Sequence, residues 1–467
     1  MPILRVDRKP FSTHVPVLIV GAGACGTIAA LAANERGVEV LILERDAKPT
    51  GSTSLSGGQI PAAGTKLQRA AGLLDDTPEI LANDIINKAH GECDHEMAWL
   101  IARESGKTVD WLVDRHQMPL SCILDFQYPG HSRMHMHASP SRFGAELLAA
   151  LLAATEREGI PIATSARVTD LYVNADDRVL GVRVTRPDGK TEEIGCDALI
   201  LACCGYGGDK AMIAKYIPEM LDAHYHGHRG NTGDAVKWGE ELGASIKDMG
   251  SFQGHGAVAT PHAIHIGWPA VTEGGYQVNK HGKRFSNDNT GYSEQALHVA
   301  RQPDHVAWLV FDERCHKIAM QMHSQVEAEK AGAVKTCHTP EEIAKLIGCD
   351  AATLEQTMQD VESYARGKAK DPFGRDFTTK PPLTTPYRVV QIMGALFHTQ
   401  GGLEINKEMR VLRKDGTPFP NLFAGGGAAR GLSGPADWGY LSGSGLLMAT
   451  NTGRLAGEAA AAQAKQG

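Results

Sequence analysis

The sequence lacks the cysteine patterns of a metal ribbon or a haem protein. Its nine cysteines are scattered along 467 residues, and none stands in a C-x-x-C pair or a C-x-x-C-H segment. Neither a zinc ribbon nor a c-type haem is therefore indicated. Unpaired thiols in this number fit a reducing compartment, and residues 1–15 lack the apolar core of a secretion signal. We expect a cytoplasmic protein.

Basic stripes, repeats and separate linkers are also missing. The formal net charge is −7, which argues against a protein that binds nucleic acid. Residues 15–34 carry no charge, but they contain three glycines and end at Asn34. This interruption favours a strand, a turn and a helix over a membrane span.

Glycine, by contrast, is abundant. It supplies 52 of 467 residues, about 11%, against roughly 7% in average proteins. The glycines cluster around apolar runs and follow no collagen-like period, so they indicate tight turns and close approaches of the backbone to a ligand. The chain is long enough for two or three domains around a large core.

The N-terminal segment has the pattern of a dinucleotide-binding unit. The apolar, β-branched run 17–20 predicts a buried strand, and Gly21-Ala-Gly-Ala-Cys-Gly26 leads from it into an Ala-rich helix. A second strand, 39–43, ends at Glu44, 23 residues after Gly21. The glycines permit a tight turn and an approach to a pyrophosphate, the helix N-terminus favours the phosphate charge, and Glu44 can accept hydrogen bonds from a ribose.

Two further segments point to FAD as the dinucleotide. The Gly/Ser-rich run 45–58 follows the second strand, and ligands lie at the carboxyl ends of parallel strands. A later strand, 197–202, ends in a second glycine-rich turn, Cys203–Gly208. Asn231-Thr-Gly-Asp then begins an amphipathic helix, with Asp234 in its first turn.

Taken in order, these segments resemble the flavoprotein subunits of the fumarate reductase and succinate dehydrogenase family. The resemblance continues in 420–426, which is similar to the family's strand leading to the FAD ribityl chain, and in 445–454, which is similar to its last helix. The matching segments cover most of residues 15–60, 165–295 and 388–460.

The resemblance implies an α/β fold, a Rossmann-like FAD-binding domain with an inserted α+β capping domain. The FAD-binding domain would comprise 1–250, with a helical insertion at about 61–150, and 391–467. The capping domain would comprise 251–390. Within it, Thr339-Pro-Glu-Glu342 predicts a capped helix start, and a second amphipathic helix is expected from Asp350 to about Gly367.

The family also implies how FAD is bound. No histidine stands near Ser54–Ser56, where covalent relatives supply one, so we expect noncovalent FAD; Gly426 stands where relatives often carry a glutamate. The residues expected at the cofactor are Gly21, Gly23, Ala24, Cys25, Gly26, Glu44, Arg45, Ser52, Thr53, Ser56, Gly57, Gly58, Val168, Ala202, Gly205, Asn231, Asp234, Gly426, Ser444, Gly445 and Leu446.

Four positions match the family's active site. Gln253-Gly-His255 and Phe397-His398-Thr-Gln-Gly-Gly402 resemble its two histidine segments. In the segment from Gly282 to Tyr292, the tyrosine occupies the place of the proton-delivering arginine of fumarate reductases. Tyr440 likewise occupies the place of an arginine that clamps a substrate carboxylate.

These two tyrosines suit a ketone better than a dicarboxylate. Guanidinium groups match carboxylates, whereas tyrosines can hydrogen-bond a ketone oxygen or, when deprotonated, take a proton from carbon. The arrangement resembles the flavin-dependent 3-ketosteroid Δ1-dehydrogenases. In that comparison Tyr292 is the base and Tyr440 holds the carbonyl, while His255 and His398 stand at matching active-site positions.

Several alternatives remain open at this point. Each histidine and tyrosine could be a packed, structural residue, and Arg430 could be a carboxylate ligand or a surface charge. The leading prediction is an FAD-dependent dehydrogenase that desaturates a small carbonyl compound, a cyclic ketone or keto acid, and passes electrons to an unidentified acceptor. The alternatives are an ene-reductase of an unsaturated carboxylate, with His398 and Arg430 as anion ligands, and a flavin redox carrier without turnover.

One histidine cluster has no place in this scheme. His131, His135 and His137 lie near Arg133 and Arg142, without a carboxylate in a metal-binding pattern. We therefore expect no metal. These histidines can equally belong to a loop that covers the substrate, and Tyr128 would then reach toward the substrate. The sequence does not indicate the oligomeric state.

Overall fold

The computed structural model describes residues 2–466, and the chain divides into two compact units that are described separately. The first unit comprises the chain up to Ile217, Gly227–Phe252 and the chain from His398 onward. The second comprises Pro218–His226 and Gln253–Phe397. The sequence-based boundaries left 218–226 with the FAD-binding domain; here β11 (His224–Tyr225) pairs with β18 (Tyr387–Thr399) of the second unit.

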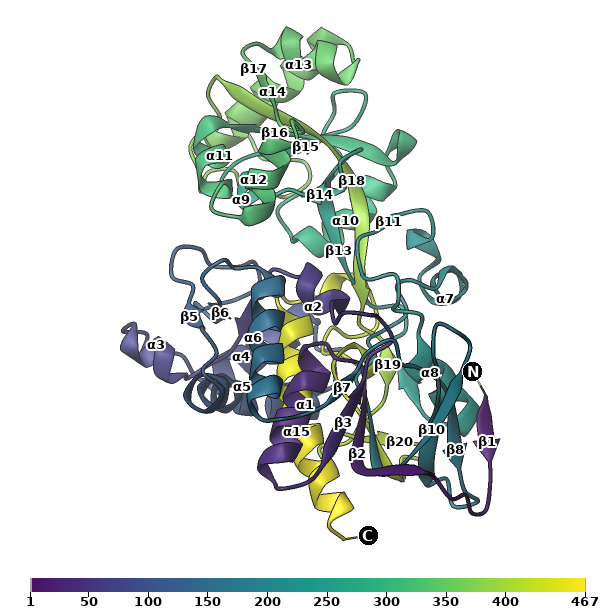
Figure 1. Ribbon diagram of the computed structural model, residues 1–467. Helices are drawn as coiled ribbons and strands as arrows, with labels where there is room; N and C mark the ends of the chain where they lie inside the picture. The colour runs from purple at the N-terminus through teal and green to yellow at the C-terminus, as the bar shows by residue number, and fades with distance from the viewer. Residues whose placement is uncertain (1, 467) are drawn as a thin grey trace. The chain divides into compact units, whose positions relative to one another are not determined.

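The first unit is built on a large mixed sheet (Figure 1). Its main path runs in the order β1 (Ile3–Arg5), β8 (Arg167–Val173), β9 (Val179–Thr185), β10 (Thr191–Leu201), β2 (Thr13–Val20), β3 (Val40–Leu43) and β7 (Ile162–Ala163). The strands β21 (Pro418–Ala424) and β20 (Arg410–Leu412) join beside β10. The strands from β10 through β7 are parallel, as the apolar runs predict.

Strand β10 joins three parts of this sheet. One edge pairs in parallel with β2 over Ile194–Leu201. The other edge is divided: Thr191–Gly195 pairs antiparallel with β9, and Leu199–Leu201 pairs in parallel with β21. The C-terminal segment of the chain therefore returns to the carboxyl end of the same strand that carries the second glycine turn.

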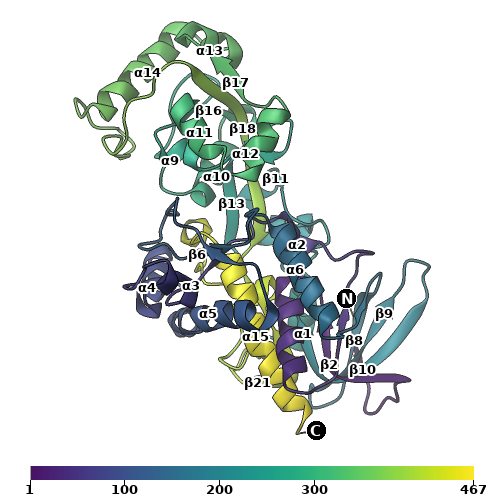
Figure 2. The ribbon, with the colours of Figure 1, turned by 60° about the vertical axis from the view of Figure 1, so that its left-hand side comes forward.

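Two long helices lie side by side against this sheet, α1 (Ala24–Glu35) and α15 (Ser444–Ala464) (Figures 1 and 2). Glycines allow them to approach. A Cβ atom on Gly453 would lie 2.6 Å from the carbonyl oxygen of Cys25, and one on Gly457 would lie 2.2 Å from that of Ala29. The packing of these helices therefore leaves no space for a side chain at either glycine.

The insertion after α2 (Gly51–Leu55) contains helices, as predicted, and also a small sheet that the sequence did not reveal. Its helices are α3 (Lys66–Ala70), α4 (Pro78–Lys88), α5 (His95–His116) and α6 (Gly144–Arg157). The sheet has the order β4 (Ile60–Pro61), β6 (Met136–Ala138) and β5 (Ser121–Cys122). Strands of two or three residues are too short to show a period of two in a sequence.

The rest of the first unit connects these parts. It contains α7 (Lys210–Tyr216), α8 (Asp234–Leu242), the strand pair β12 (Ile246–Lys247) and β19 (Gly402–Leu403), and the 3₁₀ turns η3 (Gly426–Ala428) and η4 (Asp437–Gly439).

The second unit is a sheet covered by helices. Its strands are β14 (Ile264–His265), β13 (Phe252–Ala259), β18, β16 (Val306–Asp312) and β15 (Tyr276–Val278) in that order, with β11 and β17 (Lys335–Cys337) beside β18. The helices are η1 (Pro218–Met220), α9 (Pro269–Thr272), α10 (Tyr292–Ala300), η2 (Pro303–His305), α11 (Glu313–Ala319), α12 (His323–Lys330), α13 (Pro340–Ile347) and α14 (Ala351–Ala365).

Strand β16 shows why this sheet is buried on both faces. Ala307, Leu309 and Phe311 belong to one apolar cluster, whereas the alternate residues Trp308 and Val310 belong to another. Successive side chains of a strand point to opposite faces, so a continuous apolar run supplies two cores.

The two helix starts predicted in this unit are confirmed. The hydroxyl of Thr339 accepts a hydrogen bond from the Glu342 amide before α13, and the carboxylate of Asp350 accepts one from the Thr353 amide before α14. Over residues 2–466, none of the helices is both long and apolar enough to span a membrane.

The contact between α1 and α15 makes a testable prediction. Gly457→Val should lower the free energy of unfolding by about 1–3 kcal/mol, because the new side chain meets the α1 backbone. Ala462→Val, on the exposed side of α15, is the control and should cost less than about 1 kcal/mol. Guanidinium unfolding followed by circular dichroism measures both, and equal midpoints would contradict the tight contact.

Candidate active site

The glycine turn after β2 is pressed against the turn after β10. Gly21 has a φ of +107°, and a Cβ atom on it would lie 2.6 Å from the carbonyl oxygen of Ala202. A Cβ on Gly26 would lie 1.9 Å from the carbonyl oxygen of Gly21. Gly23 is different, because its Cβ would meet only the Thr53 hydroxyl, at 3.3 Å. Two of the glycines are therefore required by packing, and Gly23 leaves room in front of α1.

Glu44 is held at the end of β3 beside this turn. Its side chain is buried, and its two carboxylate oxygens accept hydrogen bonds of 2.9 Å from the amides of Ala22 and Asp46. The carboxylate is thus fixed next to the glycine turn, as a ribose-binding residue requires. Val168 lies buried in β8, two residues after Ala166, whose amide donates to the Glu44 carbonyl.

The predicted cofactor loops meet one another. The Asn231 side-chain amide donates to the hydroxyl of Ser52 at 2.7 Å, and Arg45 donates to the carbonyl of Gly230 at 2.5 Å. The Ser52 hydroxyl also lies 3.6 Å from the sulfur of Cys204, in the turn after β10. Three segments that are remote in sequence therefore contact one another, and two of them also contact the glycine turn, through Thr53 and Ala202.

Other predicted cofactor residues have packing or capping roles. Ala24 donates its amide to the Thr53 hydroxyl at 3.0 Å, and Asp234 accepts from Thr232 at 2.8 Å. The carbonyl of Ser56 accepts the Gly144 amide at 2.8 Å at the start of α6. Near α15, a Cβ on Gly426 would lie 3.2 Å from Cys25 Cβ. A Cβ on Gly205 would lie 2.1 Å from the hydroxyl oxygen of Thr399, so that position has no space for a side chain. Gly57 lies in the loop after α2, and Ser444, Gly445 and Leu446 form the first turn of α15.

His398 and Tyr440 come together in the first unit at the start of α15. Their rings contact edge to face with centroids 5.7 Å apart. A Cβ on Gly445 would lie 2.7 Å from His398 Nε2 and 3.8 Å from the Tyr440 hydroxyl. Both polar groups therefore converge on the N-terminus of the helix.

Burial sets the protonation of this pair. It lowers the pKa of His398 to about 4, opposed by a hydrogen bond with the Thr399 carbonyl, so the imidazole is neutral at pH 7. Burial likewise raises the pKa of Tyr440 above its usual value, opposed by the amides of Gly445 and Gly443. Tyr440 is consequently a phenol that can donate a hydrogen bond.

His255 and Tyr292 come together in the second unit. The imidazole of His255 stacks on Tyr292 and on Phe397, each with centroids 5.3 Å apart. The Trp268 ring meets the His255 ring edge to face at 5.6 Å, and the His265 ring does so at 5.4 Å. The His255 imidazole is thus surrounded by four other rings.

The tautomer and charge of His255 follow from its contacts. Its Nδ1 accepts the Ala257 amide at 3.1 Å, so the neutral ring carries its hydrogen on Nε2. Burial holds its pKa well below the usual range, and His265 and His226 lower it further. His255 is therefore a neutral hydrogen-bond donor.

A network of amides sets the position of Tyr292 relative to His255. Tyr292 is the first residue of α10 and half-buried. The next residue, Ser293, accepts the amide of Gly254 at 2.9 Å. On the other side of His255, Gln277 donates to the Gly256 carbonyl at 2.8 Å and accepts from Gln295 at 2.7 Å. Both neighbours of the histidine are thereby tied, directly or through Gln277, to the first turn of α10.

Arg430 is engaged by two carboxylates. Its Nε lies 2.6 Å from Asp248 Oδ2, and one terminal nitrogen lies 3.2 Å from Asp94 Oδ2. Neither carboxylate was expected from the sequence, since both lie more than a hundred residues away along the chain. The charge of Arg430 is therefore balanced within the protein.

Three of the aromatic residues around His255 were not expected from the sequence. Sequence reasoning missed Trp268, His265 and His226, which follow no motif and meet His255 only through the fold of the second unit.

Tyr128, in the first unit, packs against Phe126 and the small cluster around Met136. Burial raises the pKa of Tyr128 to about 12.

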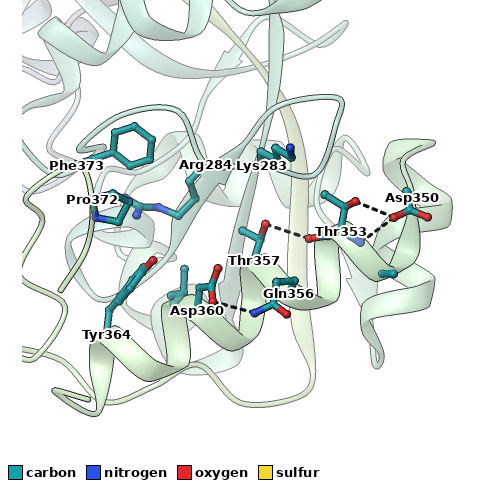
Figure 3. A pocket seen from close by; sticks show the side chains of 12 residues that line it. Lys283, Arg284, Asp350, Thr353, Gln356, Thr357, Asp360, Tyr364, Pro372 and Phe373 are labelled. Atoms are coloured by element: carbon teal, nitrogen blue, oxygen red, sulfur yellow. Dashed lines mark hydrogen bonds between the residues drawn. The ribbon is translucent and has the colours of Figure 1, made fainter. Parts of the chain in front are cut away.

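A cavity of about 510 Å³ elsewhere in the second unit contains none of the predicted site residues (Figure 3). Its polar side chains along α14 bond to one another: Asp350 with Thr353, and Gln356 with Asp360. Arg284, at its wall, is paired with Asp371. Lys283 and Tyr364 also line this cavity, which none of the side chains of the predicted site reaches.

The FAD binding domain family model matches residues 16–446. Over 457 residues the chain is 31% identical to a probable fumarate reductase of Shewanella frigidimarina, an alignment that covers 97% of this chain and 76% of that protein. The open conformation of a flavocytochrome c3 fumarate reductase has a TM-score of 0.82 and 30% identity, over 97% of this chain and 79% of that one.

The same fold occurs in a steroid enzyme. The 3-ketosteroid-Δ4-(5α)-dehydrogenase of Rhodococcus jostii RHA1, solved with 4-androstene-3,17-dione, has a TM-score of 0.76 and 24% identity, over 97% of this chain and 98% of that one. The predicted α/β fold is thereby confirmed.

The environment of Gly23 gives a test of cofactor binding. Gly23→Ala should abolish FAD retention while the apoprotein stays folded, because the new methyl group contacts only Thr53 in the protein and would occupy space needed by the pyrophosphate. Gly26→Ala should instead impair folding itself. Flavin absorbance after gel filtration, with circular dichroism, separates the two effects; full FAD occupancy in Gly23→Ala would refute this binding site.

Proposed function

Because this chain belongs to the FAD binding domain family, in which flavin oxidoreductases act on CH–CH bonds, we propose that it desaturates a carbonyl compound next to its ketone. The substrate would be a cyclic ketone or keto acid. The proposal rests on the resemblance that puts Tyr292 and Tyr440 at the positions where a dicarboxylate reductase of this family needs arginines. It is supported by one observation above all, the pairing of Arg430 with Asp248 and Asp94.

The residues around the glycine turn fit FAD. Gly23 leaves space before α1, and Glu44 presents a fixed carboxylate. The segment of Ser52 contacts the same turn through Thr53 and is hydrogen-bonded to Asn231. The bound flavin would supply an acceptor for the hydride that leaves the β-carbon. We propose that it is held without a covalent bond, since the loop with Ser54 carries no histidine.

The protein's own groups would handle the ketone and the proton. Tyr440, kept as a phenol by burial, would donate a hydrogen bond to the ketone oxygen and make the α-hydrogen more acidic. Tyr292, as the phenolate, would take that α-proton. His255 is neutral and donates through Nε2, so it would stabilise the phenolate or the developing enolate and would not compete as a base.

An ene-reductase of an unsaturated carboxylate is the second candidate. The likeness to a probable fumarate reductase at 31% identity favours it. This function needs a cation for the carboxylate, and Arg430 would have to leave one of its partners to serve. A cytoplasmic location stays a prediction.

Tyr292→Phe tests the leading proposal. The ring and its stacking on His255 are kept, so the fold and FAD content should survive, while flavin reduction by a saturated cyclic ketone should slow by roughly 10²–10⁴. Stopped-flow absorbance under anaerobic conditions measures this rate, which should rise with pH in the wild type because the phenolate is the base.

Tyr364→Phe, in α14, is the matched control and should reduce flavin at the wild-type rate. If Tyr292→Phe also does so, Tyr292 has no part in proton transfer. The reductase alternative makes the opposite prediction: reoxidation of reduced enzyme by an unsaturated acid should suffer more from Arg430→Ala than from Tyr292→Phe, at equal FAD content.

Noncovalent binding has a direct measurement. Acid precipitation of the holoenzyme should leave the yellow flavin in the supernatant, because no side chain in the Ser54 loop is expected to bond to the isoalloxazine. Mass spectrometry of the pellet should give the mass of the bare polypeptide. A pellet that keeps the colour and the added mass of FAD would disprove the prediction.

A further inference from the structure

Two histidines and an aspartate meet in the interior of the first unit, outside the residues assigned above. His131 and His135 lie on the segment that leads into β6, and Asp84 lies on α4. All three are buried, with exposed fractions of 5%, 1% and 8%. One ligand atom of each side chain lies within 4.8 Å of those of the other two, and the Nδ1 atoms of the two histidines are 2.9 Å apart.

The outer nitrogens of both rings are committed as donors. His131 Nε2 lies 2.9 Å from the carbonyl oxygen of Ser442, and His135 Nε2 lies 2.9 Å from a carboxylate oxygen of Asp76. A carbonyl and a carboxylate can only accept, so each Nε2 carries a hydrogen. In neutral imidazoles both lone pairs are then on Nδ1, and these two atoms face each other at 2.9 Å.

Facing lone pairs require a positive partner between them. The neutral imidazole is the form that binds metals, and two neutral rings in this arrangement direct both Nδ1 lone pairs at one point. Asp84 supplies a third donor, with Oδ2 3.7 Å from His135 Nδ1.

The surrounding groups have the arrangement that metal ligands require. Ligating histidines donate their other N–H to a carbonyl or carboxylate, and ligating carboxylates are themselves hydrogen-bonded. Here Ser442 and Asp76 play the first part, and Ser132 plays the second, donating its amide at 2.7 Å and its hydroxyl at 3.0 Å to Asp84 Oδ2.

We infer that His131, His135 and Asp84 bind a divalent first-row transition ion. Metal–nitrogen bonds of about 2.0–2.1 Å across the 2.9 Å between the two Nδ1 atoms give a nitrogen–metal–nitrogen angle of about 90°. This angle is typical of two histidines and one carboxylate on one face of a six-coordinate ion. The ion would join α4 and the His131 segment to the turn at Ser442, just before α15.

His137 provides a matched control two residues away. It is buried like its neighbours, but both of its ring nitrogens are used: Nδ1 lies 2.9 Å from the His135 carbonyl, and Nε2 lies 2.8 Å from the Thr65 hydroxyl. It therefore has no lone pair to offer to a metal.

The test uses the untagged, full-length holoenzyme, treated with a chelator and checked for retained FAD. Equilibrium dialysis against Co²⁺, with the metal counted by mass spectrometry, should give one equivalent per chain. His131→Gln should weaken Co²⁺ binding at least about 100-fold, whereas His137→Gln should bind like the wild type. Asp84→Asn should also weaken binding, with FAD content unchanged.

Two results would overturn the inference. The first is wild-type protein that takes up no more Co²⁺ or Zn²⁺ than His131→Gln does; the two rings would then share a proton. The second is equal loss of Co²⁺ in His137→Gln and His131→Gln. If His131→Gln does not fold, the stoichiometry of the wild type and the comparison of Asp84→Asn with His137→Gln decide the question.

Discussion

The first unit depends on the register of parallel strands that end together. Val20, Leu43 and Leu201 are partners at the carboxyl ends of β2, β3 and β10. The turns that follow must therefore share one edge of the sheet, and Gly21 can approach Ala202 only because it has no side chain. The position of Glu44, the loop of Ser52 and the return of β21 all follow from this edge. Ligands lie at such edges for the same reason.

Removal of water decides what the buried polar groups can do. Burial keeps His255 and His398 neutral and Tyr440 protonated, so none of these three is a charged ligand for a carboxylate. Groups of this kind can donate hydrogen bonds to a neutral ketone without bringing a second charge into a region of low dielectric. The electrostatic character of the buried residues thus agrees with a carbonyl substrate.

Local patterns predicted the parts of the fold that are local in origin. The strand 17–20, the helix after Gly21 and the caps at Thr339 and Asp350 were all visible in the sequence, because each depends on neighbours a few residues away. The division of one edge of β10 between β9 and β21 was not visible, since it depends on pairing between remote segments. The same is true of the stacking of His255 between Phe397 and Tyr292.

Remote partners also decide what a charged or metal-binding side chain can do. The sequence alone allows Arg430 to bind an anion. In the structure its charge is already balanced by Asp94 and Asp248, which are 336 and 182 residues away along the chain. The pair His131 and His135 lacks a carboxylate nearby in the sequence, yet the fold brings Asp84 to it. In both cases an aspartate on another element changes which partners the side chain has. The chemistry of an ionisable group in this protein is therefore set by long-range packing, and motifs identify only which groups are available to it.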